Sequence, residues 1–133
     1  MNNVNNPRTI SFEEIQDFIK NDLKTGNLYK VVSRKYKDWN YQPYILDLNK
    51  NDWFSMEIKN KNQHVVLCLD EATATVPARI PAAPIRTPTG IRAAPVTRPA
   101  MTIAQWDLWY SMFIKVLYEN KVCLVHAGWL EKL

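Results

Sequence analysis

The side chains that most often bind metal ions or act as nucleophiles are few in this chain: His64, Cys68, Cys123 and His126. His64 and Cys68 lie four positions apart in a predicted strand, which puts them on one face but about 13 Å apart, too far to share a metal ion. Neither histidine has a partner at metal-ligand spacing. Both cysteines lie among apolar residues, which favours core thiols over a disulfide bond. We therefore expect structural roles for all four, no metal site and no cofactor.

A second candidate site consists of Asp47, Glu57 and Lys59. Their order resembles in outline the D…(D/E)xK arrangement of a large family of Mg-dependent nucleases, in which carboxylates hold the metal and the lysine steadies the attacking water or the phosphate. The expected strand register puts all three on the outer face of the sheet. However, no proline precedes Asp47, and an E-x-K triplet in a strand usually marks a solvated face. The sequence thus predicts a protein that is not an enzyme, with a nuclease as an alternative.

Residues 72–101 have a composition unlike the rest of the chain. They hold six of the eight prolines and the four arginines Arg79, Arg86, Arg92 and Arg98, without any lysine or acid. The net charge of the whole chain is +4, and these arginines account for all of it. Prolines at this spacing forbid a regular helix and favour extended chain, with a reach of about 90 Å at roughly 3.1 Å per residue. This segment indicates binding and not chemistry.

Three interpretations of this Pro/Arg arm follow from its composition. In the first, the arm is a strap that docks Pro and Ile/Val into grooves of a protein partner and pairs its arginines with carboxylates. In the second, it is a tether to nucleic acid whose arginines neutralise phosphates without sequence choice. In the third, it is a stiff spacer. We favour the strap, and the residues predicted to bind the partner are Arg79, Pro81, Pro84, Ile85, Arg86, Pro88, Arg92, Pro95, Arg98, Pro99, Trp106, Trp109 and Trp129.

The residues before the arm predict an α+β fold. A helix begins after Ser11, with Glu14 as its capping-box partner, and ends near Gly26, which suits a left-handed cap. Four strands follow at 28–36, 41–48, 53–59 and 64–70, joined by short polar loops that suit an antiparallel meander. The expected register places Leu48 opposite Phe54, Leu46 opposite Met56 and Tyr44 opposite Ile58, which collects apolar residues on one face.

The residues after the arm predict a long apolar helix from Thr102 to Asn120. Its apolar side chains cover most of its circumference, which indicates burial on more than one side. Residues 122–127 fit either a last strand or more helix. We expect residues 1–71 to form the body, 72–101 the arm, and 102–133 a segment that packs on the body or on a partner. Trp106, Trp109 and Trp129 would then rim an interface.

A nucleic-acid surface is the other binding alternative. Tyr36, Trp39, Tyr41 and Trp53 lie near hairpin ends among lysines and arginines, where aromatic rings can stack on bases. Burial statistics favour core and rim positions for most of these rings.

The predicted function is therefore a non-enzymatic structural or docking protein within a larger assembly, for example a viral or phage particle, or a homo-oligomer. The first residues lack the apolar stretch of a secretory signal, and no run approaches the roughly 18 apolar residues of a membrane-spanning helix. We expect a reducing, intracellular location and no membrane insertion.

Overall fold

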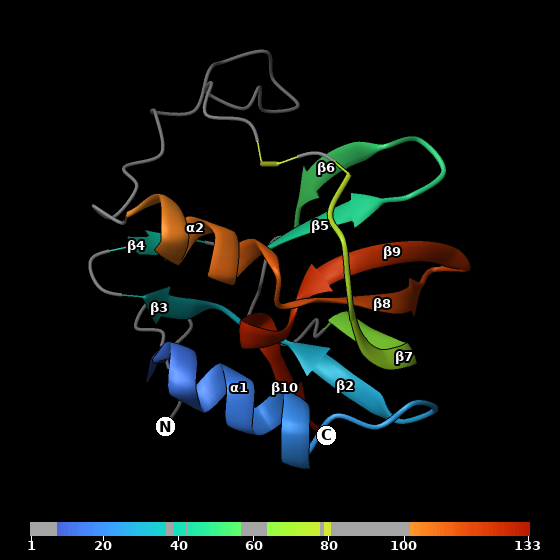
Figure 1. The fold of residues 1–133 in the computed structure, drawn as a ribbon. Helices are drawn as coiled ribbons and strands as arrows, with labels where there is room; N and C mark the ends of the chain where they lie inside the picture. Colours follow the sequence, from blue (N-terminus) through green and yellow to red (C-terminus); the bar gives the residue numbers. More distant parts are fainter. Residues whose placement is uncertain (1–7, 37–38, 42, 57–63, 78, 81–101) are drawn as a thin grey trace.

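The structure, a computed structural model, describes residues 8–36, 39–41, 43–56, 64–77, 79–80 and 102–133. These residues form an α+β fold with two helices, a seven-stranded antiparallel sheet and a small three-stranded sheet (Figure 1). The helices are α1 (Phe12–Asn21) and α2 (Ile103–Tyr110), and a 3-10 turn, η1, spans Ala127–Trp129. The strands are β1 (Arg8–Thr9), β2 (Leu28–Val31), β3 (Arg34–Tyr36), β4 (Trp39–Tyr41), β5 (Tyr44–Asp47), β6 (Asp52–Ser55), β7 (His64–Ala74), β8 (Phe113–Tyr118), β9 (Lys121–His126) and β10 (Leu130–Lys132).

Helix α1 confirms the local signals in the sequence. Ser11 caps it, and both hydrogen bonds of the capping box with Glu14 are present. The helix ends at Asn21 with Asp22 as its C-cap, earlier than the predicted end near Gly26. Gly26 has a φ of 89°, the expected left-handed conformation, but it lies in the turn after the helix and does not cap it. The apolar side of α1 packs on the sheet: Ile15 of the helix is fully buried, and so is Leu23, which follows the helix.

The seven-stranded sheet has the order β10-β2-β7-β8-β9-β5-β6. Strands β7, β8 and β9 are neighbours in the sheet. After β9 the chain passes through η1 to β10, which pairs with β2 and forms the edge of the sheet opposite β6. The register of the long strand β7 shifts between Cys68 and Asp70 and again before Thr73, as bulges that bend a strand do.

The predicted meander is right in one pairing and wrong in the others and in its register. The second and third predicted strands do pair, as β5 and β6, but β5 also pairs with β9, while β2 pairs with β7 and β10. Leu46 lies opposite Trp53 instead of Met56, a shift of three residues. An odd shift turns each side chain to the other face, so the expected apolar face does not exist as described. The turn between the two strands occupies residues 48–51, one position earlier than the predicted loop 49–52.

The predicted helix from Thr102 to Asn120 is also wrong in length. Thr102 caps it with a capping box, but the helix ends at Tyr110, and Phe113–Tyr118 is strand β8. The residues Glu119 and Asn120 have φ values of 50° and 63°, as a two-residue type I′ turn requires, and join β8 to β9. Both faces of β8 are covered over most of its length, so its side chains are apolar in both directions. That pattern is easily taken for a helix that is apolar all round.

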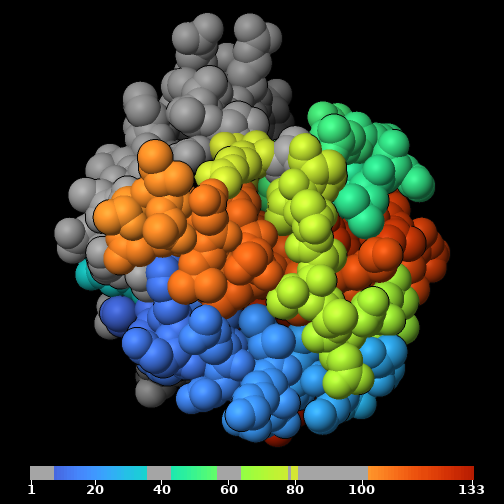
Figure 2. Space-filling view, in the orientation of Figure 1, coloured from blue at the N-terminus to red at the C-terminus, as the bar shows by residue number. Residues whose placement is uncertain are grey.

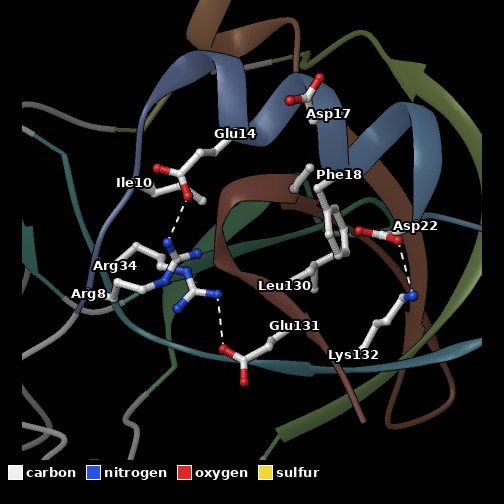
Figure 3. A pocket seen from close by; sticks show the side chains of 11 residues that line it. Arg8, Ile10, Glu14, Asp17, Phe18, Asp22, Arg34, Leu130, Glu131 and Lys132 are labelled. Carbon is white, nitrogen blue, oxygen red and sulfur yellow. Dashed lines mark hydrogen bonds and ion pairs between the residues drawn. The ribbon is translucent and has the colours of Figure 1, made fainter.

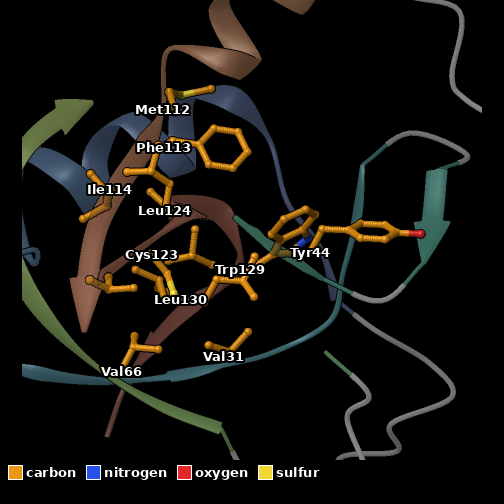
Figure 4. Packing of buried hydrophobic residues seen from close by; sticks show 14 of the residues in the cluster. Val31, Tyr44, Val66, Met112, Phe113, Ile114, Cys123, Leu124, Trp129 and Leu130 are labelled. Carbon is orange, nitrogen blue, oxygen red and sulfur yellow. The ribbon is translucent and has the colours of Figure 1, made fainter. Parts of the chain in front are cut away.

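One hydrophobic core joins residues from before and after the Pro/Arg arm (Figure 4). Figure 4 shows Val31 and Val66 close to Cys123, Leu124 and Leu130, which come from the last third of the chain. Residues of β8 and β9 such as Phe113, Ile114 and Val125 are fully buried. The C-terminal segment therefore completes the sheet on which α1 packs.

The turn at Glu119 and Asn120 gives a test of this hairpin. Asn120→Gly should raise the free energy of unfolding by about 0.5 kcal/mol, because glycine adopts positive φ without a steric cost. Asn120→Ala should lower it by about 1 kcal/mol, since Cβ opposes the left-handed conformation. Urea unfolding of both variants measures this. A helix continuing through Asn120 would reverse the order, with alanine the more stable variant.

Candidate functional site

The start of the Pro/Arg arm is anchored on helix α2. The guanidinium of Arg79 donates to the Asp107 carboxylate at 2.6 Å and lies 4.6 Å from the centre of the Tyr110 ring. The next residue, Ile80, is only 5% exposed, and its backbone N–H donates to the Tyr110 hydroxyl at 3.2 Å. Figure 2 shows these residues (yellow) against α2 (orange). The first part of the Pro/Arg segment therefore lies on the body: β7 runs to Ala74, and Arg79 and Ile80 contact α2.

Burial and not charge supplies most of the strength of this anchor. The Arg79–Asp107 ion pair is more than half exposed on both sides, and such pairs contribute about 0.5 kcal/mol. The contact of Arg79 with the Tyr110 ring adds a similar amount. Burial of the Ile80 side chain is worth about 2 kcal/mol. Ile80 thus holds the chain, and Arg79 orients it.

The far end of the arm returns to the same helix. Thr102 is the N-cap of α2: its side chain accepts from the Gln105 N–H, and the Gln105 side chain accepts from the Thr102 N–H. Helix α2 has eight residues and is therefore about 12 Å long. The two described residues that flank 81–101 therefore both lie on α2: Ile80 beside its last residue, Tyr110, and Thr102 at its N-cap.

The remaining residues predicted to bind a partner fall into two groups. Trp109 and Trp129 are buried and belong to the core of this chain, while Trp106 is half-buried on α2. Ile103 and Leu108 are exposed on the outer side of α2, at 82% and 38%. Pro81, Pro84, Ile85, Arg86, Pro88, Arg92, Pro95, Arg98 and Pro99 lie outside the described residues.

Helix α2 is fixed to the sheet by His126. The ring of His126 is stacked on that of Trp109, with centroids 4.1 Å apart. Its Nδ1 accepts from the Gly128 N–H at 3.0 Å, so its proton is on Nε2, which donates to the Trp109 carbonyl at 2.9 Å. Burial lowers the pKa of His126 from 6.5 to about 3, so the ring is neutral at physiological pH. A Cβ on Gly128 would lie 2.9 Å from Nδ1, so this contact requires glycine.

The geometry gives no support to the nuclease alternative. Asp47 is 3% exposed, whereas the prediction had placed it on a solvated face. Its Oδ1 accepts from the backbone N–H groups of Asn49 and Lys50, which closes the turn between β5 and β6. Glu57 and Lys59 lie outside the described residues. Within the part of the chain that the structure describes, no group of three His, Cys, Asp or Glu side chains is arranged to hold a metal ion.

The other candidate side chains have structural surroundings. His64 Nδ1 lies 2.6 Å from the Tyr118 hydroxyl. Cys68 and Cys123 are free and buried, as expected, and burial raises the pKa of both thiols, that of Cys123 to about 11. Trp53, one of the four rings proposed to stack on bases, is half-buried against Phe113. The side chains of Tyr36, Trp39 and Tyr41 lie outside the described set.

Comparisons with known proteins return no match: no family model, no curated protein and no solved structure is similar to this chain. Among the described residues, no helix is long and apolar enough to cross a membrane.

Sequence reasoning missed Ile80, Asp107 and Tyr110, which anchor the arm. Ile80 is a single apolar residue among prolines, and its partner lies 30 positions later in the chain. No local pattern joins them.

Two substitutions separate burial from charge in this anchor. Ile80→Ala should lower the free energy of unfolding by about 2 to 3 kcal/mol, because it removes a buried side chain from the core. Arg79→Ala should cost less than about 1 kcal/mol. Chemical unfolding followed by tryptophan fluorescence measures both. Equal effects of the two variants would show that the ion pair, and not Ile80, holds the segment.

Protonation of His126 should make stability depend on pH. The folded-state pKa lies below the unfolded value of 6.5, so this contribution is complete above pH 6.5 and falls as pH drops towards 3. At pH 4.5 the loss should be roughly 2 to 3 kcal/mol.

His126→Asn isolates this term. Its Oδ1 can still accept from Gly128, but it does not titrate in this range. The difference in unfolding free energy between wild type and variant should therefore shrink as pH falls from 7 to 4.5, while acids such as Glu14 and Glu131 contribute equally to both. A constant difference would show that His126 is accessible to protons in the folded protein.

Proposed function

We propose that this protein is a non-enzymatic docking module that binds a protein partner within a larger assembly through the Pro/Arg loop and the outer side of α2. The observation that supports this is that the two described residues flanking 81–101 lie on one short helix. Ile80 packs beside Tyr110 at one end of α2, and Thr102 caps the other end. A basic segment without acids is thereby presented from a single site on the body.

Attachment of both ends of this segment to α2 favours binding. A segment fixed at both ends samples fewer conformations than a free tail, so less conformational entropy is lost when it docks. Arginine forks on partner carboxylates then give charge-assisted hydrogen bonds, and prolines limit rearrangement. We propose an acidic protein surface as the partner on these grounds.

The outer side of α2 supplies apolar contact area beside the loop. Ile103 and Leu108 are exposed there and Trp106 is half-buried. A partner that covers this side contacts both the helix and the two ends of the loop. The two unpaired thiols suit a reducing compartment, and we propose that location.

Nucleic acid is the second candidate partner. The observation that favours it is the composition of the loop, whose arginines have no acidic neighbours in sequence. Binding to phosphates would weaken steeply with salt and would not depend on sequence. An acidic protein surface needs, in addition, the apolar side of α2.

Replacing residues 82–100 with a six-residue Gly/Ser linker should separate folding from binding. Ile80 and Thr102 remain, so the body should fold. Its free energy of unfolding should stay equal or rise by about 1 kcal/mol, because a shorter loop costs less entropy to close. Near-ultraviolet circular dichroism and urea unfolding measure this, and loss of folding would show that the loop belongs to the core.

Photo-crosslinking from Ile85 in the host cell tests the partner. We expect a crosslinked protein that resists nuclease treatment and disappears in the triple variant Arg86→Ala, Arg92→Ala, Arg98→Ala. A crosslinker at the exposed residue Lys50, in the turn after β5, is the matched control. Nuclease-sensitive products would favour the nucleic-acid alternative, and a yield no higher than at Lys50 would contradict both.

A further inference from the structure

A groove of about 500 Å³ separates helix α1 from the edge strand β10 (Figure 3). Its volume is typical of sites that bind small ligands or short peptides. Ile10, Phe18, Ala127 and Leu130 form an apolar floor, and Arg8 and Arg34 lie together at one end. At the other end, Lys132 pairs with Asp22 of the C-cap of α1 at 3.0 Å. No residue of α2 is among those that line the groove.

The groove runs along the open edge of β10. Successive side chains of a strand point to opposite faces, yet Leu130, Glu131 and Lys132 all line the groove. A cavity that contacts both faces of a strand must lie beside its edge. Strand β10 is the last strand of the sheet, and within the described residues only β2 pairs with it.

The backbone groups on this edge follow from the pairing with β2. Val32 N–H donates to the Trp129 carbonyl at 2.8 Å, so in the antiparallel pattern the next bonded pair is Glu131 with Lys30. The peptide groups of Leu130 and Lys132 therefore point away from β2. The Leu130 N–H is bonded to the Ala127 carbonyl. Within the described residues, the Leu130 carbonyl and the N–H and carbonyl of Lys132 therefore remain available to an added strand.

Two guanidinium groups meet at the end of the groove nearest η1. Arg8 and Arg34 are direct partners in the parallel pairing of β1 with β3, and Figure 3 shows both turned into the groove. Like charges in such positions destabilise a sheet. The Arg34 side chain is only 9% exposed. Burial lowers its pKa, the hydrogen bond to Glu131 partly opposes this, and the charge of Arg8 lowers it further.

The arginine end has hydrogen-bond donors to spare. Arg34 donates to the Gly128 carbonyl at 3.3 Å and to Glu131 at 3.0 Å, and Arg8 donates to Glu14 at 2.7 Å. The other N–H groups of Arg34 have no acceptor within the described residues. The remaining charged side chains that line the groove, Asp17, Asp22 and Lys132, lie away from this end. A further carboxylate at the arginine end would accept from these N–H groups of Arg34.

We propose that this groove binds an extended peptide that adds to the edge of β10 in antiparallel direction and places its C-terminal carboxylate between Arg8 and Arg34. A residue opposite Lys132 exchanges two backbone hydrogen bonds with it. The peptide's last residue lies opposite Leu130 and donates its N–H to the Leu130 carbonyl. The terminal carboxylate of the peptide then lies beyond Leu130, whose own N–H is already bonded to the Ala127 carbonyl. There it reaches Arg8 and Arg34 near Gly128.

The antiparallel direction of the peptide also determines where its last side chain lies. That side chain is on the same face as Leu130, towards Ile10 and Phe18. The ligand is therefore a peptide with an apolar last residue and a free carboxylate.

A pool of N-acetylated tetrapeptides, randomised at three positions and ending in leucine, tests this with the full chain. By fluorescence polarisation, the carboxylate pool should bind at least tenfold more tightly than the same pool with C-terminal amides. Arg8→Gln should weaken the carboxylate pool about tenfold and leave the amide pool unchanged. Methylation of the last peptide nitrogen should abolish binding, and hydrogen exchange at the Lys132 amide should slow when peptide binds.

Asp17→Asn is the matched control, since Asp17 lines the same groove at a distance from the arginines, and binding should change less than twofold. Arg8 is exposed, so its variant should keep the wild-type circular dichroism spectrum; Arg8→Lys, which keeps the charge but not the fork, should bind with intermediate affinity. Equal binding of acid and amide pools, no binding of either, or equally tight binding of free leucine would each overturn the proposal.

Discussion

The neutral ring of His126 connects three parts of the fold: strand β9, helix α2 and the turn η1 that leads into β10. It lies at the end of β9, bonds the carbonyl of Trp109 near the end of α2, and receives the N–H of Gly128, where the chain turns into β10. Without this ring, the Trp109 carbonyl would lose its bond to the end of β9, and η1 would lose the bond that fixes its first residues. The helix that carries the Pro/Arg loop and the strand that borders the groove are therefore positioned by the same side chain. The ring can do this only while it is neutral, because its surroundings offer an acceptor and a donor but no anion to balance a charge.

Local signals were sufficient for some elements and not for others. Helix α1 and the cap of α2 were predictable because capping residues lie within three positions of each other. Strand β8 was not, because Phe113, Ile114 and Val116 are buried on both sides of the sheet, and a strand covered on both faces loses the alternation that marks strands. The neighbours of β2 and β5 were not predictable either: Val31 pairs with Leu130 and Ile45 with Val125, and pairing across such separations leaves no trace in the local sequence. The preference for pairing consecutive strands misled the prediction at these two points.

The candidate site shows the same division. The composition of residues 72–101 indicated a binding segment without any structure, since charge and proline content are properties of the sequence itself. The positions of its two described ends come from contacts that composition cannot encode. Ile80 donates its N–H to the Tyr110 hydroxyl, and Thr102 caps the same helix, so both ends lie on α2. Trp109 and Trp129, which the sequence offered as interface residues, supply the rigid core behind that loop. From sequence alone, a tryptophan fits an interface as well as a core. The contacts of Trp109 and Trp129 with the buried His126 ring place both in the core.

The edge of β10 illustrates how a chain can leave a strand open without inviting aggregation. Long, flat, apolar edges pair with any other strand, and natural proteins restrict them with short length and charge. Strand β10 has three residues, carries Glu131 and Lys132, and has α1 on its open side, joined to it by the Asp22–Lys132 ion pair. In the peptide complex that we propose, a terminal carboxylate would distinguish the end of a chain from its middle. The two adjacent arginines, unfavourable in the absence of an anion, would then make this short edge selective.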